Sequence, residues 1–369
     1  MSNSKYFSEI TMGISEDIEF ADDFFFTMKN VTISVAIANC IRRIVGLDIA
    51  TVTISPETVI YQLNTSVWDN EMIIHQISYV PMKNDFLKKL DLNMIELILD
   101  VTNDKKAYRY VMSGEFVLKN KETNKIINSE DFLVYKNMPL FLLGPYQQVK
   151  LSCKLEYLTK KMSDARHQAA FAGFDYIEDP NDPKEILFNV NIQTGMNAKE
   201  LISYAFDNLI LRLKNIQENI KKSDSSSFYI QLNRYHRYDL YFIGEDHSIG
   251  HLIEKWNNRH DTRSVTGYRQ TRDNKSIYID YGLEKFSFTL TEDNNLENII
   301  EKSISSINEE KEKIQRSETL KMFIENVSRL EIYITELKDD FVNVKINSIP
   351  IDKYMDFIHS KRIERIERP

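Results

Sequence analysis

The chain has 369 residues, 42% of them hydrophobic and 28% charged, which is the balance of a globular protein long enough for two or three domains. Its net charge of -8 argues against strong nucleic-acid binding by the chain alone, because phosphate contacts need clustered Lys and Arg. Two cysteines cannot form a disulfide framework or a four-thiolate zinc site, and no apolar run or secretory signal indicates a membrane or an export route, so we expect an intracellular protein.

The first predicted elements are a strand or hairpin over residues 14–30 and a helix over Thr32–Val45. Alternating apolar residues indicate the former. Apolar residues at spacings of four, four and three give the helix a single apolar face. These residues are Ile33, Ile37, Ile41 and Ile44. We expect Thr32 or Asn30 to cap the start of this helix, and Gly46 to end it.

A mostly β insert domain is predicted over residues 82–184. A strand over Thr51–Leu63, interrupted at Pro56, precedes it. Its clearer strands cover Ile95–Val101, Tyr108–Leu118 and Val149–Leu158. The turn-forming run Asp179-Pro180-Asn181-Asp182-Pro183 marks the exit from the insert.

The strongest predicted helix follows a strand over Ile186–Gln193 and covers Asn197–Lys222. Its apolar residues repeat at spacings of four and three, which is a heptad seam. The seam consists of Ile202, Phe206, Leu209, Leu213, Ile216 and Ile220. A long helix with such a seam is expected to pack against a similar helix.

A second module is predicted over residues 223–320, and a C-terminal extension over residues 321–369. The module has strands over Phe228–Ile243, Ser264–Gln270, Ser276–Tyr281 and Phe286–Leu290, a helix over Ser248–Asn257, and a long helix from about Leu296 to Ile314. In the extension, alternation around Lys338-Asp339-Asp340 predicts a hairpin, and Tyr354–Glu367 predicts a helix. The alternating residues are Leu330, Ile332 and Ile334, then Val342, Val344 and Ile346.

One helical pattern occurs twice, in Ala36–Ile44 and in Ser248–Trp256, and each copy follows a strand-like run. Both copies have Ile at the second place, a tiny residue at the third, Ile at the sixth and a bulky apolar group at the ninth. Repetition of one strand-then-helix unit predicts that the chain carries both halves of a pseudo-symmetric pair. The predicted fold class is therefore α+β, with two pseudo-symmetric dimerisation modules of sheet plus long helices. The first module, residues 1–81 and 185–222, is interrupted by the insert.

Three sequence blocks resemble the α-type assembly subunits of multisubunit DNA-directed RNA polymerases. This family comprises the bacterial α N-terminal domain, archaeal subunits D and L, and the third and eleventh subunits of the eukaryotic enzyme. Asn39-Cys40-Ile41-Arg42-Arg43-Ile44 is similar to the family's Asn-x-Leu-Arg-Arg-Ile helix. The run from Asn64 to Glu71, with His75-Gln76-Ile77 and Val80-Pro81-Met82, resembles the block that follows it in the D-type partner. The run from Glu245 to Leu252, with Gly267-Tyr268, resembles the signature of the L-type partner.

The resemblance implies a noncatalytic assembly platform for transcription, without a cofactor or metal of its own. A D-like and an L-like half pair within the chain, with no homo-oligomer expected. Together they recruit the largest and second-largest polymerase subunits and small polymerase subunits. Nucleic acid is contacted only through the complex, and no membrane is involved. One chain with both halves is similar to the fused subunits of large cytoplasmic DNA viruses, which leaves host cytoplasm, nucleus and packaging in the virion open.

The sequence departs from the family at three points. The insert has no Cys cluster, so the zinc or iron–sulfur loop of many D-type subunits is absent. Ala38 replaces the usual Gly of the first helix, and acidic Glu254 stands where the first copy has Arg42. The two platform faces are therefore not expected to be equivalent.

Two sets of site residues follow from the motifs. The expected subunit-interface residues are Asn39, Arg42, Arg43, Asn64, Thr65, Asp69, Glu71, His75, Glu245, Asp246, His247, Gly250 and His251. The residues expected to bury the internal dimer helices are Ile37, Ile41, Ile44, Phe206, Leu209, Leu213, Ile216, Ile249, Ile253, Ile300, Ile304 and Ile307. We expect at least one of the two arginines to bind a partner, because guanidinium groups suit carboxylates and carbonyls on another chain.

Simpler interpretations of the same residues stay open at this point. Adjacent arginines are usually a solvated helix face, and Asn39 and His251 can satisfy nearby backbone groups. Gly250 costs about 1 kcal/mol inside a helix, so it predicts close packing. His247 and His251 are four apart, but Ser248 follows the first, so the His-Glu-x-x-His pattern is missing. A His-dependent metallohydrolase is the disfavoured alternative, and a free-standing scaffold of another complex is the other.

Overall fold

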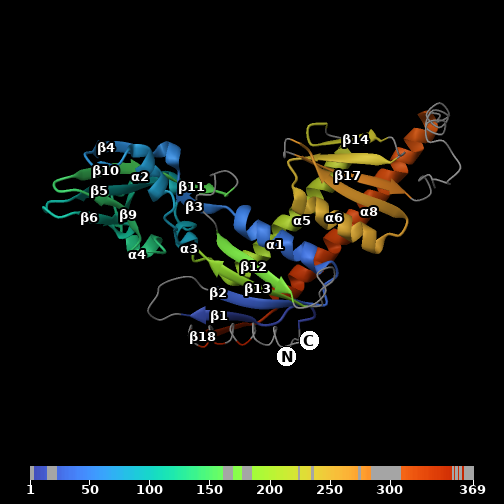
Figure 1. Ribbon diagram of the computed structural model, residues 1–369, viewed down its shortest axis with the longest axis horizontal. Coiled ribbons are helices and arrows are strands. Elements are labelled where there is room, and N and C mark those ends of the chain that lie inside the picture. The colour runs from blue at the N-terminus through green and yellow to red at the C-terminus, as the bar shows by residue number, and fades with distance from the viewer. Residues whose placement is uncertain are drawn as a thin grey trace.

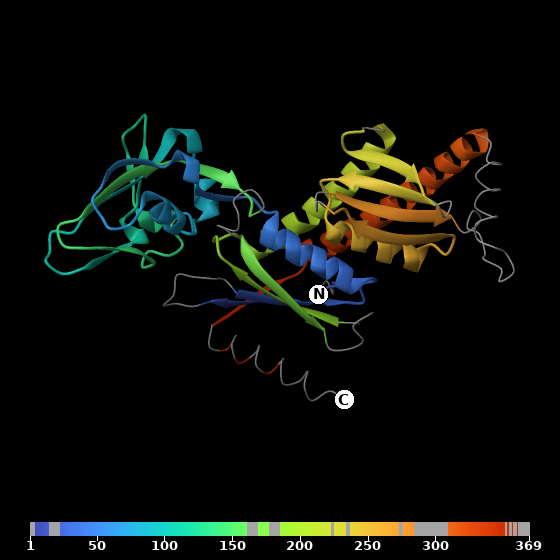
Figure 2. The same cartoon turned by 45° about the horizontal axis from the view of Figure 1, so that its top comes forward.

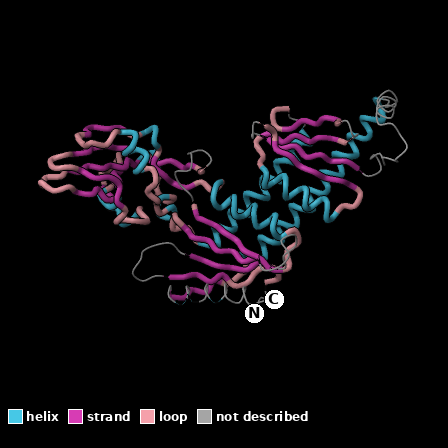
Figure 3. The backbone as a smooth tube through the Cα atoms, viewed as in Figure 1, coloured by secondary structure: helices cyan, strands magenta, loops and turns pink. Residues whose placement is uncertain are grey.

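A computed structural model of the chain describes most of its length and shows a mixed α+β protein. The described residues are 4–14, 23–160, 169–176, 185–222, 225–233, 237–272, 276–283 and 309–350, with Lys353, Asp356 and Ser360. Two sheets lie on either side of a central group of helices, and a third, β-rich part projects to one side (Figure 1 and Figure 3). No helix among the described residues is long and apolar enough to cross a membrane.

The first sheet has five strands and contains both ends of the described chain. Its order is β12 (Ala170–Tyr176), β13 (Glu185–Ile192), β2 (Asp23–Lys29), β1 (Ile10–Ile14) and β18 (Ile346–Pro350). β2 lies within the strand or hairpin predicted over residues 14–30, but its antiparallel partner β1 precedes that range. β13 confirms the strand predicted before the long helix. Phe26 and Phe188 stack with ring centroids 4.8 Å apart on the buried face. The C-terminal β18 pairs in parallel with β1, so the end of the chain completes the sheet begun by its start.

The β-rich body is a separate unit with its own core, built from residues 51–158. Its strands are β3 (Thr51–Ile54), β4 (Ile60–Asn64), β5 (Ile95–Thr102), β6 (Arg109–Met112), β7 (Val117–Asn120), β8 (Ile126–Ile127), β9 (Pro139–Leu143), β10 (Gln148–Cys153) and β11 (Leu155–Leu158). Its α-helices are α2 (Asn70–Ile77), α3 (Asn84–Leu87) and α4 (Ser129–Phe132). The break at Pro56 is a single 3-10 turn, Pro56–Thr58, as predicted.

The predicted insert boundaries, 82 and 184, are wrong at both ends. β3 pairs with β11 and β4 with β10, so residues 51–81 belong to the β-rich body. At the other end, β12 pairs with β13 and belongs to the first sheet. Hydrogen bonding between strands distant in sequence decides these boundaries, and composition does not reveal it.

The second sheet has four antiparallel strands and a helix packed on its inner face. Its order is β14 (Phe228–Leu232), β15 (Tyr238–Ile243), β17 (Ser276–Leu283) and β16 (Ser264–Gln270). The predicted single strand over Phe228–Ile243 is thus a pair of strands. α6 (His247–His260) contains the predicted helix Ser248–Asn257 and extends it at the C-terminal end.

Two long helices, α5 (Ala198–Lys222) and α8 (Glu309–Val342), run between the sheets (Figure 2). All six residues of the predicted α5 seam are buried. α8 packs along α5 in the opposite direction: Gln217 Nε2 donates to Glu331 Oε2 at 2.7 Å, and Lys338 Nζ to Asp207 Oδ1 at 2.6 Å. At about 1.5 Å per residue, the 34 residues of α8 are long enough to line both sheets.

The hairpin predicted around Lys338-Asp339-Asp340 is wrong, because these residues lie in α8. The residues that α8 buries repeat at spacings of four and three, as in α5: Phe323, Val327, Leu330, Ile334, Leu337 and Phe341. This seam prevails over the short alternation, and Ile332, which the hairpin would bury, is 67% exposed. The predicted C-terminal extension from residue 321 is wrong as well, since β18 is a strand of the first sheet and α8 packs against both sheets, with Phe341 against Phe26 and Phe323 against Phe242.

The first motif helix, α1 (Ser34–Leu47), differs from its prediction at both ends. Ile33 is its N-cap in a left-handed conformation, with φ at 52°, and no side chain caps the helix, so capping by Thr32 or Asn30 is wrong. Gly46 lies inside the last turn, and Asp48 is the C-cap. The strand Phe286–Leu290, most of the helix Leu296–Ile314 with Ile300, Ile304 and Ile307, and nearly all of the helix Tyr354–Glu367 lie outside the described residues.

Candidate functional site at the α1–α6 helix pair

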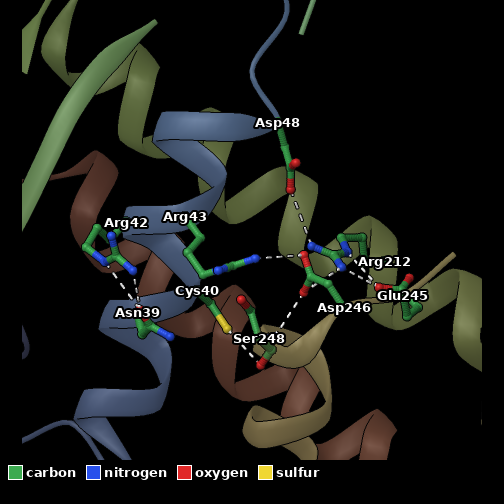
Figure 4. A network of polar contacts seen from close by, with 9 residues as sticks. All are labelled: Asn39, Cys40, Arg42, Arg43, Asp48, Arg212, Glu245, Asp246 and Ser248. Atoms are coloured by element: carbon green, nitrogen blue, oxygen red, sulfur yellow. Dashed lines mark hydrogen bonds and ion pairs between the residues drawn. The ribbon is translucent and has the colours of Figure 1, made fainter. Parts of the chain in front are cut away.

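The two copies of the repeated pattern form α1 and α6, and these helices pack directly against each other. Their buried isoleucines, among them Ile41 and Ile253, belong to one continuous core shared by both sheets and both long helices. Cys40 Sγ of α1 donates a hydrogen bond to the Ser248 carbonyl oxygen of α6 at 3.3 Å (Figure 4). Arg43, further along α1, lies 3.7 Å from Asp246 at the start of α6, and the start of α1 shares a hollow with Arg259 near the end of α6. The two helices therefore run in opposite directions.

Every described residue of the set expected to bury the dimer helices is buried in this core. These residues are Ile37, Ile41, Ile44, Phe206, Leu209, Leu213, Ile216, Ile249 and Ile253. The helical spacing in the sequence is sufficient to select them, because an amphipathic helix removes its apolar residues from water by burying the single face on which they lie.

Arg212 of α5 joins the two motif helices through three carboxylates. Its Nε donates to Glu245 Oε2 at 2.9 Å, and its NH2 lies 3.3 Å from Asp246 Oδ1, both before or at the start of α6. Its NH1 donates to Asp48 Oδ2, at the end of α1, at 3.4 Å (Figure 4). Arg43 of α1 adds a second cation, 3.7 Å from Asp246. We call these five residues the clasp.

The clasp is largely shielded from water, so the electrostatic interactions between its charged groups are stronger than they would be at the surface. The side chain of Arg212 is 14% exposed, and those of Asp48 and Glu245 are 12% and 15% exposed. Burial acts to lower the pKa of Arg212, but Glu245, Asp246 and Asp48 outweigh it and raise the pKa above its ordinary value. The guanidinium therefore stays charged, and removing it would leave three poorly hydrated carboxylates together.

The interface residues expected on the two motif helices divide into two groups. Arg43, Glu245 and Asp246 lie in the clasp and contact other parts of this chain; Asp246 also caps α6 by accepting from Ser248 N at 3.0 Å. Arg42 lies beside the clasp, where its NH2 donates to Asn39 Oδ1 at 2.8 Å on the same helix. The stretch that remains accessible comprises Arg42 and Asn39, both half-buried, with exposed His247 and half-buried His251.

Gly250 allows an aromatic ring to lie against α6, which confirms the predicted close packing. A Cβ atom at this position would stand 2.7 Å from Tyr268 Cδ2 of β16, well inside contact distance. His247 and His251 lie on either side of the same residue, with ring centroids 5.8 Å and 5.9 Å from the Tyr268 ring. The Gly-Tyr pair noted in the sequence thus meets the motif helix.

The two histidines do not converge on a third metal ligand among the described residues. No group of three or more His, Cys, Asp or Glu side chains in that part of the chain is placed to hold a metal ion. Burial, followed by the charge of Lys255, lowers the pKa of His251, so its ring is mainly neutral at pH 7.

The third motif block lies in the β-rich body, apart from the helix pair. Asn64 Nδ2 donates to the Trp68 carbonyl at 3.0 Å, and Thr65 Oγ1 accepts from Gln148 N at 2.7 Å, so both shape the loop before α2. Asp69 is the N-cap of α2 without a side-chain bond. Asp69, Glu71 and His75 are exposed on or beside α2, and Tyr79 hydrogen-bonds with His75 Nε2 at 3.2 Å. The structure therefore brings together two of the three sequence blocks.

Two clasp residues, Arg212 and Asp48, were missed from sequence. A signal for Arg212 existed, because it stands beside the seam residue Leu213 in the middle of the strongest apolar helix. Its three partners come from two other elements, and no local spacing predicts them. Asp48 follows α1 directly, where it could have been recognised only if the end of that helix had been placed correctly.

At the opposite end of the pair, a hollow of about 490 Å³ separates the start of α1 from the end of α6. Ile33, Val35 and Ala36 line one side, and His251, Lys255 and Arg259 line the other. Lys255 and Arg259 were also missed from sequence, because each is typical of the solvated face of a helix.

No protein-family model matches the chain, and no curated protein matches it.

Proposed function

We propose that this chain is a noncatalytic assembly subunit of a DNA-directed RNA polymerase, in which two α-type modules pair within one polypeptide. The first module contains the first sheet, α1 and α5, and the second contains the second sheet, α6 and α8. The β-rich body is an appendage of the first module. In this role the paired modules recruit the two large catalytic subunits and take no part in the chemistry themselves.

The observation that carries the proposal is the direct packing of α1 on α6. The two copies of the repeated pattern lie in one core, run antiparallel and share a polar clasp, and this supports the proposal of two paired units. The long helices α5 and α8 repeat the arrangement with matching heptad seams. A pair closed within the chain leaves its outer surfaces to other subunits.

Arg42, with the adjacent Asn39, is the best residue for testing recruitment. It belongs to the motif and is half-buried, and among the described residues it hydrogen-bonds only to Asn39 in its own helix turn, so reversal of its charge should leave the fold intact. Arg43 is unsuitable, because it pairs with Asp246 of the clasp and its replacement would disturb the internal pair.

The test uses tagged full-length chain as bait in an extract of its source cells, with mass spectrometry of the copurified proteins. We expect the two large polymerase subunits with the unmodified chain, and at least about fivefold less of them with Arg42→Glu. Lys221→Glu is the matched control: an exposed cation at the end of α5 that should change nothing. Recovery of a different complex would favour a free-standing scaffold, and full recovery with Arg42→Glu would remove this helix face from the interface.

A further inference from the structure

Three largely exposed tyrosines gather at one end of the β-rich body. They lie in two neighbouring segments, residues 103–110 and 144–147, which we call the tip. Tyr108, Tyr110 and Tyr146 are 72%, 58% and 67% exposed. Figure 1 shows that this end of the body faces away from the central helices. A single exposed apolar residue needs no explanation, whereas three large aromatic side chains on one tip indicate an interaction surface.

Asn103 fixes the shape of the tip from the inside. It is fully buried, and its Nδ2 donates to the carbonyl oxygens of Ala107 at 2.9 Å and of Gly144 at 2.8 Å. Its backbone N donates to the Gln147 carbonyl oxygen at 2.9 Å, and its own carbonyl oxygen accepts from Tyr146 N at 2.8 Å. These bonds tie the two segments together. The tyrosines therefore extend from a preorganised support, which lowers the entropic cost of binding a ligand.

Tyr146 has a backbone conformation that an aromatic residue rarely adopts. Its φ is 59°, in the left-handed region where Gly and Asn are favoured. The residue is also largely exposed, so packing within the body does not compensate for the strain. An aromatic residue that is both strained and exposed points to a role in contact with another molecule.

The spacing of Tyr108 and Tyr110 suits a planar ligand. Tyr108 directly precedes β6 and Tyr110 lies within it, while Arg109 is half-buried and Val111 is buried. This alternation places the two tyrosines on one side of the chain, about 7 Å apart along it. Stacked nucleobases follow one another at about 3.4 Å, so a base stacked between two rings needs about 7 Å. The pair is therefore spaced to hold one nucleobase between its rings.

Two lysines beside the tyrosines supply cations for a phosphate backbone. Lys105 and Lys106 are exposed and form no salt bridge with any residue that the structure describes. Arg109 is not available in the same way, because it pairs with Glu115. Asp104 is exposed too, so the net charge of the tip is small. Stacking on the tyrosines, rather than charge, must therefore supply most of the binding energy.

We propose that the tip binds single-stranded RNA, with bases stacked on the three tyrosines and phosphates near Lys105 and Lys106. The inference rests on the proposed function, in which single-stranded RNA is the product of the polymerase that this chain assembles. A single strand exposes the faces of its bases, whereas a duplex hides them, so stacking on the tip requires a single strand. Most protein side chains are not planar rings, so the spacing of Tyr108 and Tyr110 favours a nucleobase over a protein partner.

A binding experiment with the full chain tests the tip without the polymerase. The probe is a short fluorescein-labelled oligo-U, measured by anisotropy, and a labelled RNA duplex of the same length is the comparison. We expect Tyr110→Leu to weaken binding of oligo-U at least about fivefold, and Tyr110→Phe to change it less than about twofold, because a phenyl ring still stacks. Tyr157→Leu is the matched control, at an exposed tyrosine on β11 of the same body, and should change nothing.

Two further measurements separate stacking from charge and from folding. With two lysines as the phosphate contacts, the logarithm of affinity should fall with the logarithm of salt concentration with a slope of about -1.4. Tyr146→Asn should weaken binding of oligo-U at least about fivefold and yet raise the melting temperature of the chain, because Asn tolerates the left-handed conformation better. Thermal unfolding of every variant also confirms that each is folded.

Four results would overturn the proposal. The first is undetectable binding of oligo-U, or equal binding of oligo-U and the duplex. The second is an equal effect of Tyr110→Leu and Tyr157→Leu. The third is a salt slope steeper than about -3, which would place the contacts on a phosphate-binding surface elsewhere. The fourth is a copurified protein that is lost with Tyr110→Leu and is unaffected by RNase.

Two experiments in the source cells complete the test. Ultraviolet crosslinking should give an RNase-sensitive adduct on the peptide that contains Tyr108 and Tyr110, and a DNase-sensitive adduct would overturn the choice of RNA. The pull-down described above separates this inference from the proposed function. Large subunits that copurify with a chain unable to bind oligo-U leave the assembly role standing and reject the tip. Tyrosine-dependent binding of oligo-U without any polymerase subunits rejects the assembly role and leaves the tip standing.

Discussion

The two ends of the α1–α6 pair use similar charges in opposite ways. At the closed end, Arg43 and Arg212 meet three carboxylates in a shielded clasp, and every cation is used inside the chain. At the open end, Lys255 has no salt-bridge partner among the described residues and faces a hollow. The comparison teaches that a motif match does not by itself separate residues that hold a fold from residues that bind a partner. Burial and pairing do separate them.

Removal of Arg212 should break the closed end and give the largest effect. Arg212→Ala leaves Asp48, Glu245 and Asp246 close together and poorly hydrated, so we expect the free energy of unfolding to fall by about 3–5 kcal/mol. Urea denaturation measures it. Lys221→Ala, an exposed cation at the end of the same helix, should stay within about 0.5 kcal/mol. A loss below 1 kcal/mol for Arg212→Ala would show that the clasp does not close the pair.

The tiny residues at the third place of the two motif copies should also behave differently. Gly250→Ala brings a Cβ to 2.7 Å from the Tyr268 ring, so we expect a loss of about 1–3 kcal/mol, although Ala is the better helix former. Ala38→Gly should cost about 1 kcal/mol through helix propensity. Thermal unfolding measures both.

A double mutant tests the physical reason for the Gly250 effect. Tyr268→Ala removes the ring, so adding Gly250→Ala to that variant should cost little or should stabilise α6. Simple additivity of the two single effects would mean that the ring yields easily and does not account for the glycine.

Helical seams were predictable from the sequence, whereas pairings between distant elements were not. The α5 seam and the buried isoleucines of α1 and α6 follow from spacing alone. The α8 seam from Phe323 to Phe341 has the same spacing, and it prevails over the short alternation within it that predicts a hairpin. A helical period sustained over several turns should outweigh an alternation of only three apolar residues. The long pattern is specific to a helix, whereas so short an alternation can also occur inside one.

The chain boundaries and the clasp needed the fold itself. The parallel pairing of β18 with β1 joins residues at the two ends of the chain, and no local pattern indicates it. Arg212 similarly finds its partners at the ends of α1 and the start of α6. The motif located the helices, but only the packing assigned Arg43 and Asp246 to an internal pair.

The adjacent arginines of α1 sharpen the comparison at the scale of a single side chain. Arg43→Ala removes an ion pair with Asp246 whose side chains are 33% and 19% exposed and lie 3.7 Å apart, so we expect a loss of about 0.5–1 kcal/mol after allowing for screening by water. Among the residues that the structure describes, Arg42→Ala removes only the hydrogen bonding to Asn39 on the same helix, and it should cost less than about 0.5 kcal/mol. Parallel urea titrations measure the two. Equal losses in the free energy of unfolding would mean that both arginines belong to the clasp. Arg42 could then no longer be used to test recruitment separately from folding.

The smallest effect concerns the two cysteines, which report opening of the two cores separately. Burial raises the pKa of both Cys40 and Cys153 to about 12, so at pH 8 neither forms an appreciable fraction of the reactive thiolate, and native alkylation by iodoacetamide should be slow. Cys40 lies beside the clasp on α1, whereas Cys153 belongs to the β-rich body with its own core. Since each core can open locally, Arg212→Ala should speed alkylation of Cys40 by at least about tenfold and that of Cys153 by less than about twofold. Mass spectrometry of the peptides containing each cysteine gives both rates in one sample. Equal acceleration of the two alkylation rates would mean that the β-rich body unfolds together with the helix pair, so that the two cores do not open independently.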